Sequence, residues 1–256
     1  METIIRKIDK NNKVKIAIVG KYIKLEDSYI SVIESVKHAG FANDVETEIK
    51  LIDAEKITKD TADEMLKDFQ GIIVPGGFGN RGIEGKIETI KYARENKIPF
   101  LGICLGMQMA VVEYARDVLG LKDANSQEFD EKSENKVIHI MENQKSVNKK
   151  GGTMRLGSYP CIIKEGTLAE KIYGTKEIAE RHRHRFEYNN DYKERLENAG
   201  LICSGTSPDG ELVEIVELSQ KEHPFFIAGQ FHPELKSRPN KPAPLFVELV
   251  KVAKNI

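Results

Sequence analysis

Cys104 lies in the stretch Gly102-Ile-Cys-Leu-Gly106, whose residue types and spacing suit nucleophilic chemistry. The apolar residues 100–103 before it predict a buried strand, and residues 105–114 after it predict a helix. The two glycines allow strand and helix to meet in a tight turn, which is the form of a nucleophile elbow with cysteine in place of serine. The N-terminus of the helix would favour the reactive thiolate. The elbow alone leaves two interpretations, a catalytic nucleophile or a small buried hydrophobic residue.

A glycine-rich stretch, residues 74–82 with the sequence VPGGFGNRG, follows the strand that we predict before the elbow strand. It lacks the Gly-Lys-Ser/Thr ending of a phosphate-binding P-loop and the glycine spacing of a dinucleotide site. It is either a simple turn or an oxyanion hole. In the second interpretation, backbone N–H groups of Gly76 or Gly77, together with that of Leu105, would stabilise a tetrahedral intermediate formed at Cys104.

His232 and Glu234 form a His-Pro-Glu motif after the last predicted strand. Two residues apart in an extended segment, their side chains could share a face, although Pro233 could bend the backbone. His232 would then act as a general base, and Glu234 would orient the imidazole and stabilise its charged form. Alone this motif is weak, because His232 could be a surface residue. Together with the elbow and the glycine loop, it predicts a Cys–His–Glu arrangement.

Residues 180–190, with the sequence ERHRHRFEYNN, are the most unusual run of the protein. A solvated basic strand would explain it. Strand alternation would also place Arg181, Arg183 and Arg185 on one face, which suits an anionic group. We do not expect a metal site here, because the arginines beside His182 and His184 would repel a cation.

The elements that must position these residues alternate between strands and helices. Alternation predicts an α/β fold with a mostly parallel central sheet flanked by helices, with ligands bound beyond the carboxyl ends of the strands. Asp27 or Ser28 could cap the first helix, and Gly40 would end it. The predicted helices span residues 29–39, 57–69, 83–96, 105–114, 167–173 and 244–253. The predicted strands span residues 14–19, 45–52, 71–74, 100–103, 137–141, 159–163, 201–204, 212–216 and 225–231.

We expect a linker remnant or tail over residues 1–12 and a single domain over residues 13–256. The domain contains two polar segments, a largely irregular loop over residues 119–135 and a mobile stretch over residues 142–150. The sequence shows no internal repeat and no low-complexity segment.

Composition limits the possible partners and compartment. The formal net charge of −1 gives no electrostatic case for nucleic acid binding. The sequence has three cysteines, no signal peptide and no long apolar run, so we expect a cytoplasmic protein in a reducing environment that does not bind membranes. Cys161 and Cys203 lack the flanking glycines of an elbow, and we interpret them as buried hydrophobic residues.

Three motifs together resemble the signatures of the class I (triad-type) glutamine amidotransferases: PGGFG at residues 75–79, GICLGMQ at 102–108 and FHPE at 231–234. Further stretches narrow the resemblance to the C-terminal glutaminase domains of CTP synthases. They are Gly20-Lys-Tyr with the helix ending in KHAG at 37–40, GGTMRLG at 151–157, and RHRHRFE at 181–187 with the following Asn189-Asn190. The resemblance covers the sequence from residue 14 onward and implies the flavodoxin-like fold of that family.

The resemblance implies hydrolysis of L-glutamine to glutamate and ammonia. Cys104 would attack the side-chain amide to form a γ-glutamyl thioester, His232 would protonate the leaving ammonia and then activate water, and Glu234 would hold His232. Glu128 would meet the substrate α-amino group, and Arg185 would pair with its α-carboxylate. The residues matched to glutamine binding are Gly77, Phe78, Leu105, Gly106, Met107, Gln108, Glu128, Arg185 and Phe186.

The resemblance also implies partners outside this sequence. CTP synthases carry an N-terminal amidoligase domain that uses ATP, with Mg²⁺, to convert UTP to CTP, and nothing here matches it. We therefore expect no cofactor in this domain, GTP as an allosteric activator, and an amidoligase domain as the acceptor of ammonia. Residues 151–157 are our candidate lid segment, which we expect to be poorly ordered without GTP and the partner domain.

Two other functions stay open at this point. The protein could be a glutaminase subunit of a different synthetase or a γ-glutamyl hydrolase, although the 181–186 run argues against both. It could also be a non-catalytic module that senses glutamine or nucleotide, although the intact Cys–His–Glu set argues against that. The rate of ammonia release from free glutamine, compared with the rate of cleavage of γ-glutamyl peptides, distinguishes a glutaminase from a γ-glutamyl hydrolase.

Overall fold

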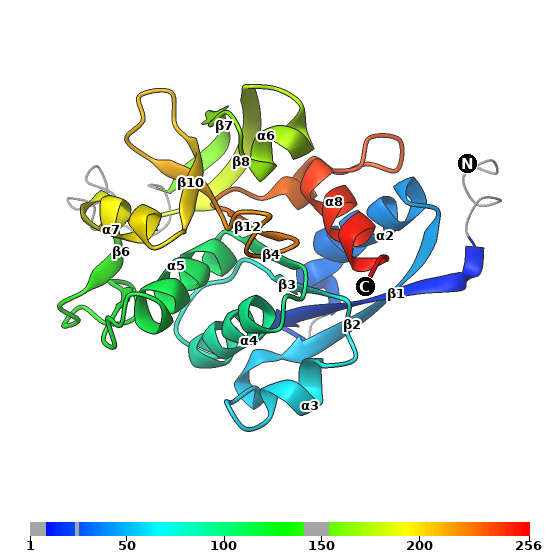
Figure 1. Ribbon diagram of the computed structural model, residues 1–256, viewed down its shortest axis with the longest axis horizontal. Coiled ribbons are helices and arrows are strands. Elements are labelled where there is room, and N and C mark those ends of the chain that lie inside the picture. The colour runs from blue at the N-terminus through cyan, green and yellow to red at the C-terminus, as the bar shows by residue number, and fades with distance from the viewer. Residues whose placement is uncertain (1–8, 24–25, 141–153) are drawn as a thin grey trace.

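The computed structural model describes residues 9–23, 26–140 and 154–256, and the first strand begins at the start of this range. Among these residues, nine strands form one sheet that runs through the centre of the molecule (Figure 1). In spatial order the strands are β2 (Val45–Asp53), β1 (Asp9–Gly20), β3 (Gly71–Val74), β4 (Phe100–Ile103), β12 (Phe226–Gly229), β11 (Val213–Glu217), β10 (Ile202–Thr206), β7 (Arg155–Ile163) and β8 (Glu177–His184).

The sheet consists of a parallel part and an antiparallel extension. β2, β1, β3, β4 and β12 pair in parallel, whereas β12, β11, β10, β7 and β8 pair antiparallel to their neighbours. The parallel part matches the predicted alternation of strands and helices. The extension arises because the second half of the sequence has several strands joined without a crossover helix, which favours antiparallel pairing.

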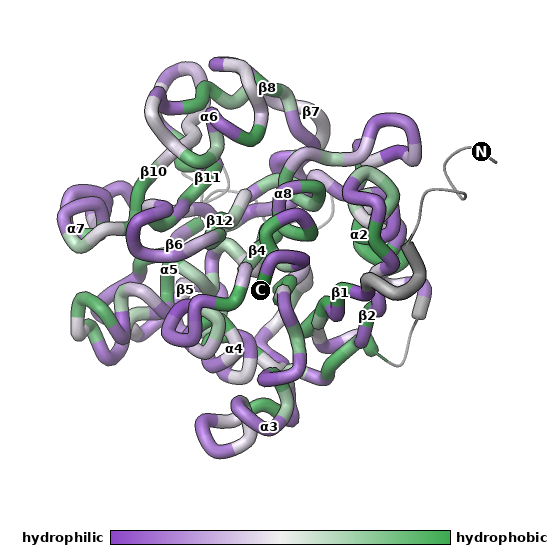
Figure 2. Tube along the Cα trace, turned by 45° about the vertical axis from the view of Figure 1, so that its right-hand side comes forward, coloured by the Kyte–Doolittle hydropathy of each residue, from purple (hydrophilic) through white to green (hydrophobic). Residues whose placement is uncertain are grey.

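Helices cover both faces of the sheet, as predicted for an α/β fold. Buried side chains of α3 (Ala62–Leu66), α4 (Ile83–Glu95) and α5 (Leu105–Asp117) form one core, and those of α2 (Ile30–Ala42), α6 (Leu168–Tyr173) and α8 (Pro244–Ala253) contribute to a second. Figure 2 shows hydrophobic segments along the central strands and hydrophilic turns around α3 and α7 (Lys193–Asn198). Over the described ranges, no helix combines the length and the apolar character needed to cross a bilayer.

A small second sheet lies beside α5 and consists of β5 (Asn125–Ser126), β6 (Lys136–Ile140) and β9 (Phe186–Tyr188). β6 pairs in parallel with β5 and antiparallel with β9. Because β9 follows β8 after a single residue, the backbone passes from the large sheet to the small one at Arg185. This crossing brings Arg185 near Glu128, which follows β5, and the polar loop predicted over residues 119–135 therefore contributes to the site.

The predicted capping residue and the predicted end of the first helix are wrong, although the helix begins at Ile30, one residue after the predicted Tyr29. Neither Asp27 nor Ser28 caps it, because residues Glu26–Tyr29 form a 3-10 turn and the N-cap position is Tyr29 without a side-chain cap. The helix also continues through Gly40 to Ala42. A Cβ at Gly40 would lie 2.9 Å from Cγ2 of Thr47 and 3.0 Å from the Val45 carbonyl oxygen, so this glycine permits close packing against β2 rather than ending the helix.

Other boundaries differ at element ends. β1 extends back to Asp9, and β7 begins at Arg155 rather than at residue 159. The helix predicted over residues 57–69 is confined to Ala62–Leu66, with a 3-10 turn over Ala54–Lys56 before it. The mobile stretch predicted over residues 142–150 and the first part of the candidate lid, residues 151–153, lie outside the described residues.

Candidate active site

Cys104 occupies the junction of β4 and α5 with the backbone geometry of an elbow. Its φ of 52° and ψ of −102° are strained for a side chain with a Cβ, and its N–H donates to the Gly229 carbonyl oxygen at 2.7 Å. A Cβ at Gly102 would lie 2.7 Å from the Cβ of Ala228, and one at Gly106 would lie 2.0 Å from the Val74 carbonyl oxygen. Both predicted glycines are therefore required by close contacts, and the strand–helix approach fixes the position of the cysteine.

Cys104 is almost completely buried, and its thiol has polar neighbours from β8 and from the segment after β12. Its Sγ lies 3.8 Å from the Arg183 carbonyl oxygen, and Nε2 of Gln230 donates toward it from 3.6 Å. Cys104 also stands at the N-cap of α5, where free N–H groups of the first turn favour a negative charge. Gln230 was not predicted, although it directly precedes the Phe-His-Pro-Glu motif.

His232 and Glu234 come together through the bend that Pro233 introduces. Residues Pro233–Leu235 form a 3-10 turn, and Nδ1 of His232 lies 2.7 Å from Oε1 of Glu234, so the imidazole donates to the carboxylate. The His232 N–H donates to the Arg181 carbonyl oxygen at 2.8 Å, which fixes this loop against β8.

His232 also adjoins Cys104. A Cβ at Gly76 would lie 2.9 Å from Cε1 of His232 and 3.6 Å from the Cβ of Cys104. Burial lowers the pKa of His232, but its hydrogen bonds to Cys104 and Glu234 and the charges of these groups outweigh burial and raise the pKa to about 10. The geometry therefore favours an imidazolium beside the thiol at neutral pH.

The glycine loop lies against the elbow as the oxyanion-hole hypothesis requires. Gly76 is next to Cys104, and a Cβ at Gly77 would lie 3.6 Å from Cδ2 of Leu105. The N–H of Leu105 belongs to the first turn of α5 and has no acceptor within the helix. Nζ of Lys21 donates to the Gly79 carbonyl oxygen at 3.0 Å and holds the far side of the loop.

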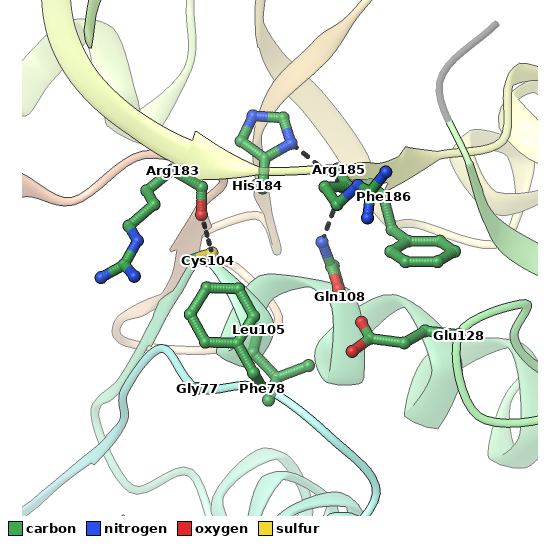
Figure 3. A pocket seen from close by; sticks show the side chains of 10 residues that line it. All are labelled: Gly77, Phe78, Cys104, Leu105, Gln108, Glu128, Arg183, His184, Arg185 and Phe186. Atoms are coloured by element: carbon green, nitrogen blue, oxygen red, sulfur yellow. Dashed lines mark hydrogen bonds between the residues drawn. The ribbon is translucent and has the colours of Figure 1, made fainter. Parts of the chain in front are cut away.

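A pocket opens beside Cys104, shown in Figure 3. Seven of the residues that line it were predicted to bind glutamine: Gly77, Phe78, Leu105, Gln108, Glu128, Arg185 and Phe186. Gly106 and Met107 lie outside this lining, because Gly106 packs on the Val74 carbonyl and Met107 is completely buried in the core. Arg183 and His184 complete the lining with Cys104 itself.

The pocket contains groups of both charges. Burial raises the pKa of Glu128, while the Gly79 N–H, Lys21 and Arg185 act in the opposite direction. Its Oε1 accepts from the Gly79 N–H at 3.3 Å, and in Figure 3 its carboxylate points toward Gln108. Arg185 enters from the β8–β9 corner. One acidic and one basic side chain near a thiol suit a zwitterionic ligand.

The basic run on β8 divides between two faces of the strand. Arg181 and Arg183 are exposed, whereas His182 and His184 are buried. The strand ends at His184, so Arg185 leaves β8. It lines the pocket together with Arg183, whereas Arg181 lies outside the pocket lining. Within the described ranges, no group of His, Cys, Asp and Glu side chains is arranged to hold a metal ion.

Cys161 and Cys203 are buried away from the pocket, as predicted for structural cysteines. Burial raises the pKa of Cys203 to about 11 and that of Cys161 further still. Thiols with raised pKa values are poor nucleophiles at neutral pH, so these two residues do not compete with Cys104.

Lys86 is a charged residue near the site that sequence reasoning missed. It is completely buried in α4, and its Nζ would lie 3.5 Å from a Cβ at Gly77. Its Nζ has no hydrogen-bond acceptor among the residues that the structure describes. Burial and the charge of Lys21 lower its pKa to about 7. Nothing in the helical pattern of residues 83–96 distinguishes it from a surface lysine.

Comparison with known proteins places this geometry in a family. The family model described as glutamine amidotransferase class-I matches residues 24–252. The protein belongs to the class I glutamine amidotransferases. The Cys104 elbow, the glycine loop and the His232–Glu234 pair all lie within the matched residues.

Among its relatives are CTP synthases. The sequence is 56% identical over 253 residues to the CTP synthase of Clostridium acetobutylicum, and 55% identical over 255 residues to that of Caldanaerobacter subterraneus. These matches include 98% and 100% of the present sequence but 47% of each relative, so this class I glutamine amidotransferase spans about half the length of those proteins.

A solved structure matches most of the protein. The glutaminase domain of the Trypanosoma brucei CTPS, determined with bound acivicin, superposes with a TM-score of 0.87 at 41% identity over 94% of each protein. The protein is thus a homologue of the glutaminase domain of CTP synthase, and the flavodoxin-like amidotransferase fold expected from the motifs is confirmed.

We expect Gly106→Ala to lower the free energy of unfolding by roughly 3 kcal/mol, because the added Cβ would overlap the Val74 carbonyl oxygen. Urea denaturation measures this change. The matched control is Gly120→Ala, where the space is open and a φ of 74° alone should cost about 1 kcal/mol. Equal losses in the two variants would contradict the requirement for close packing at the elbow.

We expect Glu234→Gln to lower the pKa of His232 toward its ordinary value of 6.5, because one of the groups that raise it is lost. Histidine NMR titration measures the pKa directly. The control is Glu248→Gln, which removes a carboxylate paired with Lys251 in α8 and should leave His232 unchanged.

The same substitution has a consequence for stability. Since the folded pKa of His232 exceeds the unfolded one, its contribution is fully present below pH 6.5 and is lost as the pH rises to about 10. Unfolding free energies of the Glu234→Gln variant should therefore fall less steeply over this interval than those of the wild type. Equal slopes of unfolding free energy against pH in the two proteins would contradict the conclusion that Glu234 raises the pKa of His232.

Proposed function

We propose that this domain hydrolyses L-glutamine to glutamate and ammonia through a γ-glutamyl thioester on Cys104. The observation that carries the proposal is the placement of the elbow thiol between the His232–Glu234 pair and a pocket that contains Glu128 and Arg185. Membership of the class I glutamine amidotransferases supports the reaction class. The bond that breaks joins the amide carbon of glutamine to its amide nitrogen, and the bond that forms is the thioester.

Each step has a candidate group. The thiolate of Cys104 attacks the amide carbon, and the N–H groups of Leu105 and of Gly76 or Gly77 stabilise the oxyanion. The imidazolium of His232 donates its proton to the leaving nitrogen, which departs as ammonia. Neutral His232 then removes a proton from water, the water attacks the thioester, and glutamate leaves as Cys104 is regenerated.

Recognition of the amino acid follows from the charges of the pocket. Glu128 would accept from the α-ammonium group and Arg185 would donate to the α-carboxylate, while Gln108, Phe78 and Phe186 enclose the aliphatic part. A ligand with both charges at one end is fixed in orientation, so its side-chain amide is directed toward Cys104. Gly106 and Met107, which the motif match also assigned to glutamine binding, lie outside the lining of this pocket and have no role in this proposal.

We further propose that the domain supplies ammonia to an amidoligase domain that converts UTP to CTP with ATP and Mg²⁺, as in CTP synthases. The support is the similarity to CTP synthases over the full sequence. In this proposal GTP stimulates glutamine hydrolysis and no cofactor binds this domain. Ammonia release measured with and without GTP tests the effector, and a rate without GTP that equals the stimulated rate would contradict it.

A γ-glutamyl hydrolase or the glutaminase subunit of another synthetase is the alternative catalytic assignment. The 41% identity to the CTP synthase glutaminase domain of Trypanosoma brucei favours the present assignment, and the 181–187 run of the sequence argues in the same direction. If the protein cleaves a γ-glutamyl dipeptide faster than it hydrolyses free glutamine, the assignment as a γ-glutamyl hydrolase would be favoured instead. A non-catalytic sensing role would give glutamine binding without ammonia release.

We expect Cys104→Ala to reduce kcat for ammonia release from L-glutamine by roughly 10⁴-fold or more, because the nucleophile is lost. A coupled glutamate dehydrogenase assay measures the rate. Cys203→Ala is the matched control, since this buried thiol lies away from the pocket and its removal should change the rate by about 2-fold or less. Activity that survives Cys104→Ala would overturn the mechanism.

We expect Arg185→Met to raise KM for L-glutamine by about 10- to 100-fold, because the substrate carboxylate loses a charged hydrogen-bond donor. The effect on kcat should be smaller. Initial-rate kinetics separate the two constants. Arg181→Met is the control because that exposed side chain lies on β8 outside the pocket. Similar KM values in both variants would remove Arg185 from substrate binding.

A further inference from the structure

Two buried histidines on β8 have no part in the proposed reaction. His182 is 2% exposed and His184 is 3% exposed, in a strand whose neighbouring arginines point outward. Burial and the charge of Arg155 lower the pKa of His184 to about 3 and that of His182 to about 2, so both imidazoles are neutral at pH 7. A neutral imidazole has one donor and one acceptor nitrogen, so its partners determine its tautomer.

The contacts of the two rings determine where each proton lies. Nδ1 of His184 is 3.0 Å from the carbonyl oxygen of Phe186, which can only accept, so His184 carries its proton on Nδ1. Its Nε2 is therefore an acceptor. Nδ1 of His182 is 3.0 Å from this Nε2 and must donate to it. Both rings are thereby assigned the Nδ1–H tautomer.

The far end of the pair lies beside the ion pair of Arg155 and Glu214. Nη1 of Arg155 lies 2.5 Å from Oε1 of Glu214, and Oε2 of Glu214 lies 3.7 Å from Nε2 of His182. Nη1 of Arg155 is also 3.4 Å from Nδ1 of His182, but this nitrogen carries a proton, so the guanidinium donates to Glu214 instead. The ring of His182 is therefore packed against a fixed, charged neighbour.

The near end of the pair reaches the nucleophile. The Phe186 carbonyl that accepts from His184 also accepts from Nε2 of Gln108 at 2.9 Å, and Figure 3 shows both bonds converging on this residue. The same Nε2 lies 3.1 Å from Oε1 of Gln230, whose Nε2 donates toward Sγ of Cys104. Arg185 lies between His184 and Phe186 in the sequence, so the hydrogen bond between these two residues spans it.

We propose that His184 is a positioning residue for glutamine: its Nδ1–H holds the Phe186 carbonyl as the shared acceptor for Gln108 and thereby fixes the corner that presents Arg185 to the pocket. His182 acts behind it by donating to His184 Nε2 and so selecting the tautomer. The proposal rests on the proposed function, because it assigns His184 to the glutamine-binding side of the pocket.

Two near-isosteric substitutions separate this role from simple packing. The side-chain amide of His184→Asn places a donor where Nδ1 lies, so it can keep the bond to Phe186. The longer amide of His184→Gln places its polar atoms where Nε2 lies, so it keeps the contact to His182 and loses the bond to Phe186. We expect KM for L-glutamine to change by about 3-fold or less in the first variant and to rise by about 10-fold in the second.

The opposite order of KM values, or equal values in the two variants, would overturn the proposal, because simple packing does not distinguish the two amides in this way. Failure of His184→Asn to fold would also overturn it, since the bond to Phe186 would then not be the one that matters. If only His184→Gln fails to fold, the KM comparison cannot be made, and the tautomer of His184 in the wild-type protein tests the proposal instead.

Long-range ¹⁵N–¹H NMR of the wild-type protein between pH 6 and 8 reports that tautomer without glutamine. We expect neutral Nδ1–H forms at His184 and His182, and an Nε2–H form at His184 would overturn the proposal. This measurement separates the two levels of inference. A wild-type protein that releases no ammonia fails the proposed function, whereas a wrong tautomer fails only the role of His184.

Discussion

The close approach of β4, β3, β12 and α5 around Cys104 is the constraint on which the rest of the site depends. Gly102 and Gly106 leave no room for a Cβ, and the cysteine between them accepts a positive φ that only a surrounding, well-packed sheet can maintain. Such strain is stored at the site and offset by the apolar burial of the neighbouring strands. Backbone packing therefore decides the position of Cys104, and the conformational preference of its own side chain does not.

The histidines on the two sides of the Cys104 thiol differ in charge. On one side, His232 is protonated because Cys104 and Glu234 together outweigh its burial. On the other, His182 and His184 remain neutral because burial and the charge of Arg155 oppose protonation. One protein therefore contains a protonated imidazole and two neutral imidazoles close to each other, because the groups that surround each ring differ.

The antiparallel extension gives the site its second half. The parallel strands supply the elbow and the glycine loop, as in other doubly wound sheets with ligands at the carboxyl ends. Arg183, His184 and Arg185 reach the same pocket only because β8 lies at the far edge of the sheet and the backbone then crosses to β9. The backbone of Arg181 also binds the His232 loop, so this edge contributes to the alignment of the imidazole with the thiol.

The sequence by itself determined the elements whose signals are local. The elbow glycines, the boundaries of β3 and β4 and the helix over residues 244–253 follow from short-range patterns of size, polarity and turn chemistry. The roles proposed for Cys104, His232 and Glu234 rest on local motifs of the same kind. Tertiary structure decided the position of Gly40 inside a helix and the end of β8 before Arg185. It also decided the approach of Lys86 and Gln230 to the site. These features depend on contacts between residues that are distant in the sequence. Whether a charged side chain such as Lys86 is exposed to water or buried near the site is determined only when the protein folds, and with it the local dielectric.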